Sequence, residues 1–434
     1  MKLYLHTIGC RLNQSEIETM ARQLLAAGHT LVSDPAQADK IIVNTCAVTN
    51  EAARDGRTFT RRAHRQNPDA EILLTGCYAT IAPDELANVK GAGRIVPNAQ
   101  KSQLVQLIDP AIEPETAGRT SAAVYDREPI LREFLAGNLS HTRAFIKVQD
   151  GCDNRCTFCV TTIARGAGQS RHLGDVVAEI QALAAAGYRE AVLTGVHLGS
   201  YGRDLANKTD LRRLVAAVLA HTDIPRLRLS SLEPWEIPDG FLGLWQEPRL
   251  LPHLHMPLQS GSDKILRRMA RRASRESFRQ LAAAARAHIP DLSLTTDIIV
   301  GFPGETEAEF EESLDFVREI GFSRLHVFPY SSRPGTAAAA MPGQVPGPVK
   351  KERTRRLIQL GESLALAFHR RYERQTRHVL WEANVGADPE GLRWAGYTDN
   401  YIRVMAHSPV DLFNSVTVTR LVAARPDVVW GEIV

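Results

Sequence analysis

The residues most able to do chemistry in this chain are six cysteines, which fall into two sets of three. One set, the tight triplet, has Cys-x3-Cys-x2-Cys spacing and comprises Cys152, Cys156 and Cys159. The other set, the dispersed triplet, comprises Cys10, Cys46 and Cys77. Thiolates select iron–sulfur clusters, zinc or copper. Three thiolates leave one corner of a four-iron cube without a protein ligand, and a small molecule can bind and react there.

Zinc and plain core packing are the alternative interpretations of these cysteines. A structural zinc site uses four ligands, usually as two Cys-x-x-Cys-like pairs, whereas one short stretch supplies the tight triplet and no fourth ligand follows nearby. A buried cysteine can also be a small apolar core residue, which is the simplest interpretation of any single member of the dispersed triplet. The spacing favours a [4Fe–4S] cluster with one open iron on the tight triplet.

Composition sets the class of protein. A chain of 434 residues with 44% hydrophobic and 23% charged residues is typical of a globular enzyme of two or three domains. The first residues, MKLYLHTIGC, lack the apolar core of a secretory signal, and no run of about eighteen uncharged apolar residues follows. We therefore expect a cytoplasmic protein that makes no contact with a membrane and uses its cysteines for metal binding or catalysis rather than disulfides.

The dispersed triplet lies in a segment of alternating strands and helices, residues 1–110. Its expected strands are Lys2–Thr7, Lys40–Val43 and Glu71–Leu74, and its expected helices are Gln14–Ala27 and Glu51–Gln66. This pattern predicts an α/β domain with a parallel sheet. Each dispersed cysteine comes just after a strand, within the strings IGC, NTC and TGC. Ligands of such sheets gather beyond the carboxyl ends of the strands, so the three cysteines can converge on one site.

The tight triplet lies in a segment of six successive β/α units, residues 138–370. The expected strands are Phe145–Asp150, Ala191–Val196, Arg226–Ser231, His253–Leu258, Leu292–Val300 and Arg324–Tyr330. The expected helices are Leu173–Ala186, Leu211–His221, Ser277–His288, Glu307–Ile320 and Val349–Arg374. The pattern predicts a TIM-type barrel, complete or partial, whose chemistry lies at the carboxyl ends of its strands. The tight triplet directly follows the first strand.

Two further segments complete the expected organisation. The stretch before the barrel has mixed composition, with one expected strand at Ala122–Tyr125. Residues 371–434 change to short alternating runs separated by turn residues, which predicts a small all-β barrel. The expected strands there are His378–Glu382, Gly391–Thr398, Tyr401–Met405 and Ser415–Val422.

The string DGCDNRCTFC, placed after the first strand of a β/α barrel, resembles the motif of the radical S-adenosylmethionine (SAM) superfamily. The resemblance implies that the tight triplet holds a [4Fe–4S] cluster whose open iron chelates SAM. Electron transfer from the reduced cluster then cleaves SAM, and the resulting 5′-deoxyadenosyl radical abstracts a hydrogen atom. It also implies SAM contacts from Phe158, at the adenine, and from Thr194, Gly195 and Val196, at the methionine amino group.

The strings TIGCRLNQSE, VNTCAVTNEA and LLTGCYA, followed by the tight triplet, resemble the methylthiotransferase family. PHLHMPLQSGSD at 252–263 and TTDIIVGFPGETE at 295–307 extend the match over nearly the whole chain. The resemblance implies a second [4Fe–4S] cluster on the dispersed triplet. It also implies two SAM molecules in each turnover, one donating a methyl group to sulfur held at that cluster and the other yielding the radical.

Within this family, NTCAVTNEA, RRAHRQNPDAEILLTGCYA and TGVHLGSYGRD most resemble the branch that acts on threonylcarbamoyladenosine in tRNA. This resemblance implies methylthiolation of the adenine C2 position of N6-threonylcarbamoyladenosine next to the anticodon. Two alternatives within the family are isopentenyladenosine in tRNA and a ribosomal-protein aspartate. An alternative of another class is a non-catalytic, metal-stabilised RNA-binding protein.

Three polar residues at strand ends are further candidates for the SAM or substrate pocket. Asp297 lies within the fifth expected barrel strand, and Gln259 and Ser260 come just past the fourth. Helix capping is an equally good explanation of Glu305 and Thr306 in the loop that follows Asp297.

Basic residues gather in three places, where the alternatives are solvated helix faces and phosphate contacts. They are Arg61, Arg62, Arg65; Arg267, Arg268, Arg271, Arg272; and Lys350, Lys351, Arg353, Arg355 and Arg356. The C-terminal segment interleaves aromatic and basic residues that are candidates for core packing or for stacking on unpaired bases: Trp381, Trp394, Tyr397, Tyr401, Arg393 and Arg403. Its position resembles the RNA-binding TRAM domain of the family. The implied partners are the tRNA anticodon stem-loop and a flavodoxin- or ferredoxin-type electron donor.

Overall fold

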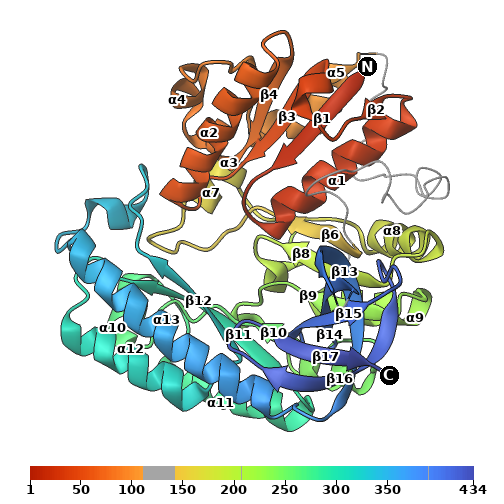
Figure 1. Ribbon diagram of the computed structural model, residues 1–434. Coiled ribbons are helices and arrows are strands. Elements are labelled where there is room, and N and C mark those ends of the chain that lie inside the picture. The colour runs from red at the N-terminus through yellow and green to blue at the C-terminus, as the bar shows by residue number, and fades with distance from the viewer. Residues whose placement is uncertain (111–141, 207, 390) are drawn as a thin grey trace.

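The computed structural model describes residues 1–110, 142–206, 208–389 and 391–434. Across these ranges the fold is α/β, with an N-terminal parallel sheet, an arc of parallel strands covered by helices, and a C-terminal barrel (Figure 1). The predicted fold class is confirmed. The strand expected at Ala122–Tyr125 lies outside the described residues. In the described ranges, no helix has both the length and the apolar character needed to cross a membrane.

The N-terminal sheet has the strand order β2-β1-β3-β4-β5, and all its pairings are parallel. Its strands are β1 (Lys2–Thr7), β2 (Thr30–Leu31), β3 (Lys40–Thr45), β4 (Glu71–Gly76) and β5 (Arg94–Val96). Its helices are α1 (Arg11–Ala26), α2 (Asn50–Gln66), α3 (Cys77–Ile81), α4 (Pro83–Ala87) and α5 (Leu104–Ile108). Ile42 packs with the core on the α1 side, whereas Ile41 and Val43 pack with the core on the α2 side. This alternation explains why the buried strands are continuously apolar.

The central segment provides six parallel strands in an arc. They are β6 (Arg143–Asp150), β8 (Glu190–Gly195), β9 (Arg226–Leu229), β10 (His253–His255), β11 (Ser293–Val300) and β12 (Arg324–Pro329), with β7 (Gln169–Ser170) antiparallel to β6 at the edge. Strands β6-β8-β9 and β10-β11-β12 form two sheets, which parallel bridges from Leu227 to Leu250 and from Ser231 to His255 join. Among the described residues β12 does not pair with β6, so the structure is a partial (β/α)6 barrel (Figure 1).

Most helices of this segment cover the outside of the arc. The helices are α7 (Thr161–Arg165), α8 (Leu173–Ala185), α9 (Leu211–His221), α10 (Asp263–Arg268), α11 (Arg275–His288), α12 (Glu307–Ile320) and α13 (Gly347–Arg370). Local signals fix several of their starts. Asp210 caps α9 by accepting a hydrogen bond from the Arg213 backbone N–H at 2.8 Å. Thr306 and Glu309 form a capping box at the start of α12, which accounts for Thr306 as a structural residue.

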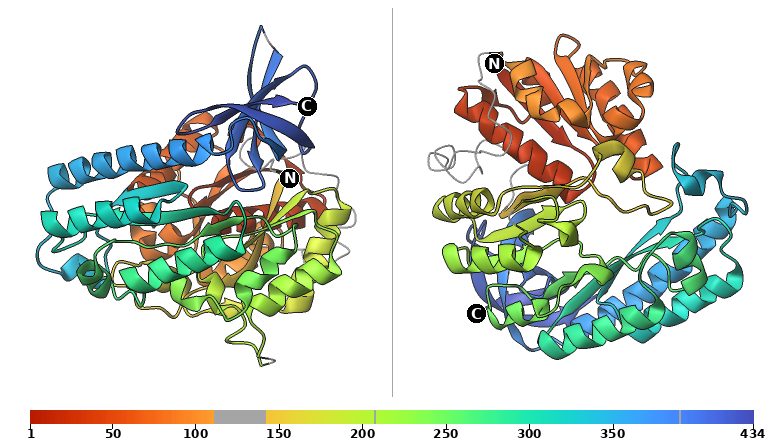
Figure 2. Two further views of the ribbon diagram at one scale, coloured as in Figure 1. Left: turned by 90° about the horizontal axis from the view of Figure 1, so that it is seen from below. Right: turned by 180° about the vertical axis from the view of Figure 1, so that it is seen from behind.

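The C-terminal segment forms a closed barrel in the order β13-β14-β15-β17-β16. Its strands are β13 (Thr376–Asp388), β14 (Gly391–Thr398), β15 (Arg403–Ser408), β16 (Val416–Ala424) and β17 (Val429–Ile433). Trp381 and Trp394 are buried in its core, so neither ring is free to stack on a base. Figure 2 shows this barrel projecting from one side of the arc.

The C-terminal barrel docks at the amino ends of the arc strands. Arg226, which begins β9, donates to the Thr398 carbonyl at 3.1 Å. Tyr401 enters the same end: Arg143 donates to its hydroxyl at 3.0 Å, and the Arg228 guanidinium lies 4.4 Å from its ring centroid. Tyr397 stacks on Tyr401, so both tyrosines are occupied inside the protein. The small barrel therefore lies at the opposite end of the arc strands from the tight triplet.

The N-terminal sheet docks on the arc through an ion network at the buried Glu16 of α1. The Glu16 carboxylate lies 2.6 Å from the Lys101 Nζ, 3.4 Å from the Lys147 Nζ and 2.9 Å from the Arg165 Nη1. Lys147 is on β6 and Arg165 ends α7, so two of the three cations come from the arc. Burial raises the pKa of Glu16, but these cations outweigh it and hold that pKa well below its usual value. The ionised carboxylate of Glu16 therefore holds the N-terminal sheet and the arc together through ion pairs.

Replacement of the Glu16 carboxylate tests its role in docking the N-terminal sheet on the arc. In Glu16→Gln three cations lose their common counter-charge, and we expect the apoprotein to lose about 3–5 kcal/mol of unfolding free energy in urea denaturation. The matched control is Glu276→Gln, because the Glu276 side chain is 62% exposed and its loss should cost less than about 0.5 kcal/mol. Equal effects of the two substitutions would contradict a role for Glu16 in docking.

Candidate active site

The dispersed triplet meets at one edge of the N-terminal sheet, as predicted. Cys10, Cys46 and Cys77 follow the carboxyl ends of β1, β3 and β4, which are adjacent parallel strands. Gly9, at φ +107°, lets the chain pass close to Cys46, because a Cβ on Gly9 would lie 2.7 Å from the Cys46 Sγ. Cys46 and Cys77 are buried, and Cys10 is exposed.

Two of these sulfur atoms meet N–H donors. The Val48 backbone N–H donates to the Cys46 Sγ at 3.4 Å, and the Asn98 side-chain amide lies 3.7 Å from the Cys77 Sγ. Burial raises the pKa of the Cys46 thiol to about 12, so the free thiol is neutral at ordinary pH. Bound iron would supply the positive charge that keeps this sulfur as a thiolate. The donor set therefore fits an iron–sulfur cluster.

The tight triplet lies in the loop between β6 and α7. The Asn154 backbone N–H donates to the Cys152 Sγ at 3.4 Å, and the Thr161 backbone N–H donates to the Cys159 Sγ at the same distance. Arg271 is buried, lies 3.9 Å from the Cys156 Sγ and pairs with Glu233 at 2.9 Å. All three cysteines are partly exposed. This loop thus offers thiolates to a ligand that reaches it from outside.

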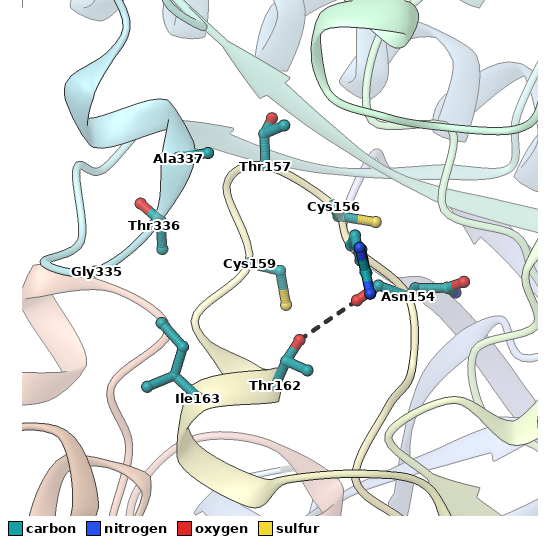
Figure 3. Close-up of a pocket in the computed structure, with 10 residues that line it drawn as sticks. Asn154, Cys156, Thr157, Cys159, Thr162, Ile163, Gly335, Thr336 and Ala337 are labelled. Carbon is teal, nitrogen blue, oxygen red and sulfur yellow. Dashed lines mark hydrogen bonds between the residues drawn. The ribbon is translucent and has the colours of Figure 1, made fainter.

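A cavity of about 220 Å³ opens beside this loop. Its walls include Cys156, Cys159, Thr162 and Ile163, and Figure 3 shows that both sulfur atoms come from the same loop. Gly335, after β12, forms part of the opposite wall. Within the described ranges no three His, Cys, Asp or Glu side chains are grouped as ligands of a single metal ion. A four-iron cluster separates its thiolates more widely, since each binds a different iron.

The predicted SAM-contact residues lie around this loop. Phe158 packs against the apolar cluster of Met269, Phe302 and Tyr330. Thr194 is buried, and its hydroxyl donates to the Val192 carbonyl at 3.1 Å. The two residues that follow Thr194 at the carboxyl end of β8 are half-buried: Gly195 and Val196. Thr194, Gly195 and Val196 therefore lie at the end of the strand that pairs with β6, which leads into the tight-triplet loop.

Two residues that the sequence did not single out link the end of β8 to the tight triplet. The Gln149 side chain donates to the Gly151 carbonyl at 2.8 Å and accepts from the His197 backbone N–H at 2.8 Å. The His197 ring contacts Asn154 at 3.2 Å and pairs with Glu236. Burial lowers the pKa of His197, but Cys152 and Glu236 outweigh it and raise that pKa to about 9. The string TGVHLGSYGRD contained His197, but nothing in it indicated this role.

Asp297 lies inside the arc beside two histidines. Its carboxylate is 3.3 Å from the His255 Nε2, and the His255 and His326 ring centroids are 5.6 Å apart. Burial raises the pKa of Asp297, but the neighbouring histidines and Arg271 outweigh it and hold that pKa below its usual value. The sequence pointed to Asp297 from its position on a strand, but the two histidines became candidates only once β10, β11 and β12 were seen to be neighbours.

The strand-end residues Gln259 and Ser260 are placed differently from each other. Gln259 has φ +73°, and its backbone N–H donates to the Asp297 carbonyl at 2.8 Å, next to the candidate site. Ser260 is buried, and its hydroxyl lies 3.4 Å from that of Ser313 on α12, so it supports the fold. Glu305 is also structural, because it accepts from the Gly301 backbone N–H at 2.6 Å and pairs with Arg353.

The two triplets lie close together across the interface between the sheet and the arc. Helix α7, which follows the tight triplet, packs against α3, which begins with Cys77 (Figure 1). Asn98 spans the junction, since its amide lies 3.7 Å from the Cys77 Sγ and donates to the Ala164 carbonyl at 2.9 Å. The loop after β12 also contacts both sides: the Ala338 backbone N–H donates to the Thr157 carbonyl at 2.8 Å, and Arg333 donates to Asn50 at 2.7 Å.

Comparison with known proteins gives two family matches. Residues 2–96 match the Uncharacterized protein family UPF0004, and residues 146–317 match the Radical SAM superfamily. In structure, the chain is similar to a radical S-adenosylmethionine methyltransferase from Kitasatospora setae, with a TM-score of 0.56 at 16% identity over 78% of this chain and 77% of that one. The latter similarity concerns the fold alone.

Three curated relatives match over most of their length. The threonylcarbamoyladenosine tRNA methylthiotransferase of Bacillus subtilis is 37% identical over 96% of this chain and 93% of the relative. The tRNA-2-methylthio-N(6)-dimethylallyladenosine synthase of Moorella thermoacetica is 33% identical, with coverage of 99% and 97%. The ribosomal protein uS12 methylthiotransferase of Anaeromyxobacter sp. is 36% identical, with coverage of 90% and 86%.

The arc with its tight triplet defines the class, a radical SAM enzyme. The chain belongs to the methylthiotransferase family, which confirms the resemblance found in its sequence. The radical SAM segment implies a [4Fe–4S] cluster and SAM as cofactors, and the N-terminal segment suggests a second cluster.

Iron content tests the two cysteine sites. We expect anaerobic reconstitution to load about eight irons per chain in the natural protein and about four in Cys46→Ala, because each triplet would hold one four-iron cluster. Colorimetric iron and sulfide assays with Mössbauer spectroscopy would measure this. If the unaltered chain binds only about four irons, the assignment of a second cluster to the dispersed triplet would be contradicted.

Proposed function

We propose that this enzyme methylthiolates the adenine C2 position of N6-threonylcarbamoyladenosine next to the anticodon of tRNA. The juxtaposition of the two triplets, through α3, α7 and Asn98, carries the proposal, because a radical site and a sulfur-presenting site must reach the same atom. An aromatic C–H does not react by ordinary acid–base chemistry, so a radical route is needed. The choice of substrate is supported by the Bacillus subtilis relative and by a second one from Thermotoga maritima, 36% identical.

The six cysteines would divide the work between two clusters. Cys152, Cys156 and Cys159 would hold the cluster that binds SAM, and Cys10, Cys46 and Cys77 would hold the one that presents sulfur. When bound, the first supplies the electron that cleaves SAM to the 5′-deoxyadenosyl radical, and the second supplies the sulfur site. The N–H donors at Cys46, Cys152 and Cys159 stabilise the thiolate form of these ligands.

The remaining candidate residues would orient SAM and the base. Phe158 lies two residues from Cys156 and next to Cys159. The neighbouring strand β8 ends with Thr194 and Gly195, and Val196 follows it. We propose that these four residues border SAM. Asp297 and Gln259 are proposed to border SAM or the base from β11 and from the loop after β10. Because the pKa of Asp297 lies below its usual value, its carboxylate would be ionised and ready to accept a hydrogen bond from a bound molecule.

The proposed partners are the tRNA anticodon stem-loop and a flavodoxin- or ferredoxin-type electron donor, in the cytoplasm. Several exposed cations that could meet phosphates remain on each of two surfaces, Arg61, Arg62 and Arg65 on α2 and Arg267 and Arg272 near α10. On α13, Lys351 is exposed, but Arg355 pairs with Glu352. Arg353 and Arg356 of α13 are instead paired with Glu305, Glu307 and Glu311. We therefore assign the phosphate contacts to the first two surfaces rather than to α13.

Single substitutions in the two triplets should separate two activities. We expect Cys156→Ala to abolish the reductive cleavage of SAM to 5′-deoxyadenosine, because one ligand of the SAM-binding cluster is lost. We expect Cys46→Ala to retain cleavage but to form no methylthio product. Liquid chromatography of 5′-deoxyadenosine and of digested tRNA would measure both. Normal methylthio product from Cys46→Ala would refute the assignment of the dispersed triplet.

The nature of the substrate is tested in cells. In a strain from which the gene is deleted, we expect mass spectrometry of tRNA nucleosides to show the loss of methylthio-threonylcarbamoyladenosine, and a plasmid copy to restore it. A copy with Cys156→Ala is the matched control and should not restore it. Loss of the methylthio-isopentenyladenosine signal instead, or an unchanged tRNA profile with an unmodified ribosomal-protein aspartate, would contradict the proposed substrate and favour the other branches of the family.

A further inference from the structure

Arg333 is a buried cation without a complete set of partners at the junction of the two triplets. It lies in the loop after β12 and is 7% exposed. Its Nη1 atom donates to the Asn50 side chain at 2.7 Å. Within the described residues, its Nε and Nη2 atoms are buried and have no hydrogen-bond partner. Buried guanidinium N–H groups normally find acceptors, so this side chain is prepared for a group that binds there.

The backbone around Arg333 holds it in place. Pro334 follows directly and restricts the conformation of Arg333 to the extended region. The Thr336 hydroxyl donates to the Arg333 carbonyl at 2.8 Å, and Ala338 is tied to Thr157 of the tight-triplet loop at 2.8 Å. The loop is thus anchored on the SAM side, while the Arg333 guanidinium reaches across the interface to the start of α2.

The group that Arg333 faces is on the sulfur side. Asn50 begins α2, four residues after Cys46, and the turn between them is closed by the bond from the Val48 N–H to the Cys46 sulfur. Burial lowers the pKa of Arg333, although the Cys46 and Tyr78 side chains lie close enough to act on its charge in the opposite direction. Arg165 lies at the same interface, but Glu16 and Asp150 already neutralise it at 2.9 Å each.

We propose that Arg333 is a positioning residue for the dispersed triplet, and that its Nε and Nη2 atoms, which have no partner within the described residues, donate to the anionic sulfur of the cluster held there. Three thiolates give a bound cluster a net negative charge, and Arg333 supplies both a cation and directed donors in a buried place. Net charge and hydrogen bonds to sulfur set the reduction potential of such clusters. The proposal rests on the second cluster of the proposed function, but not on the identity of the substrate.

The reduction potential of that cluster provides the test. A full-length chain with Cys152, Cys156 and Cys159 all changed to Ala holds only the cluster of the dispersed triplet, and EPR-monitored redox titration then reports one site. In this background we expect Arg333→Gln to lower the potential, because the reduced cluster loses a stabilising cation. A tenfold fall in the equilibrium constant for reduction corresponds to about 59 mV. Arg333→Lys, which keeps the charge, should shift it less.

Arg54→Gln is the matched control. Arg54 lies one turn into the same helix α2, but its side chain is 68% exposed, so water screens its charge and the potential should not change. An unchanged potential in Arg333→Gln would overturn the proposal. If Arg333→Gln fails to load iron while Arg333→Lys loads it, the result would show that cluster binding requires a cation at this position. If both variants fail equally, the proposal is overturned, because the loop rather than the charge would then matter. If the variant without the tight triplet binds no iron at all, the dispersed triplet holds no cluster, and the role proposed for Arg333 is overturned with it.

Discussion

The ion network around the buried Glu16 carboxylate is the interaction on which the docking of the N-terminal sheet against the arc depends. It is surrounded by Lys101 from its own segment and by Lys147 and Arg165 from the arc. Charges buried this deeply are stable only when all partners are present, so the network accepts one docking geometry and penalises others. Arg165 ends α7, and α7 follows the tight triplet, so the same network that holds the two parts together also sets where the tight triplet faces.

Parallel-sheet topology provides the second constraint. Cysteines that are far apart in sequence meet because β1, β3 and β4 are neighbours that run the same way. The arc obeys the same rule, since the tight triplet follows β6 at its carboxyl end. The C-terminal barrel covers the amino ends of the arc strands through contacts of Tyr401 and Arg226. The N-terminal sheet therefore docks at their carboxyl ends. Two sites built on separate sheets thereby become neighbours.

Much of this was predictable from the sequence, because strand-end position is a local property. The sequence placed the cysteines and Asp297 at or near the ends of strands, and its periodicity predicted the helices Leu211–His221 and Glu307–Ile320, which the structure has with the same bounds. Residues that act through tertiary contacts were not found. His197, Gln149 and Arg333 carry no motif of their own, and their partners come from other elements. Strand β17 was missed because its apolar run, Val428 to Trp430, is too short to show alternation.

If the two triplets serve one reaction space, the reduced clusters should be magnetically coupled. The EPR spectrum of the fully reduced two-cluster protein would be compared with the sum of the spectra of two variants, each of which lacks one triplet. We expect a two-cluster spectrum that is broadened and relaxes faster than this sum, because paramagnetic centres on either side of the α3–α7 contact interact. A spectrum equal to the simple sum would show that the clusters are remote from each other and would contradict a shared reaction space.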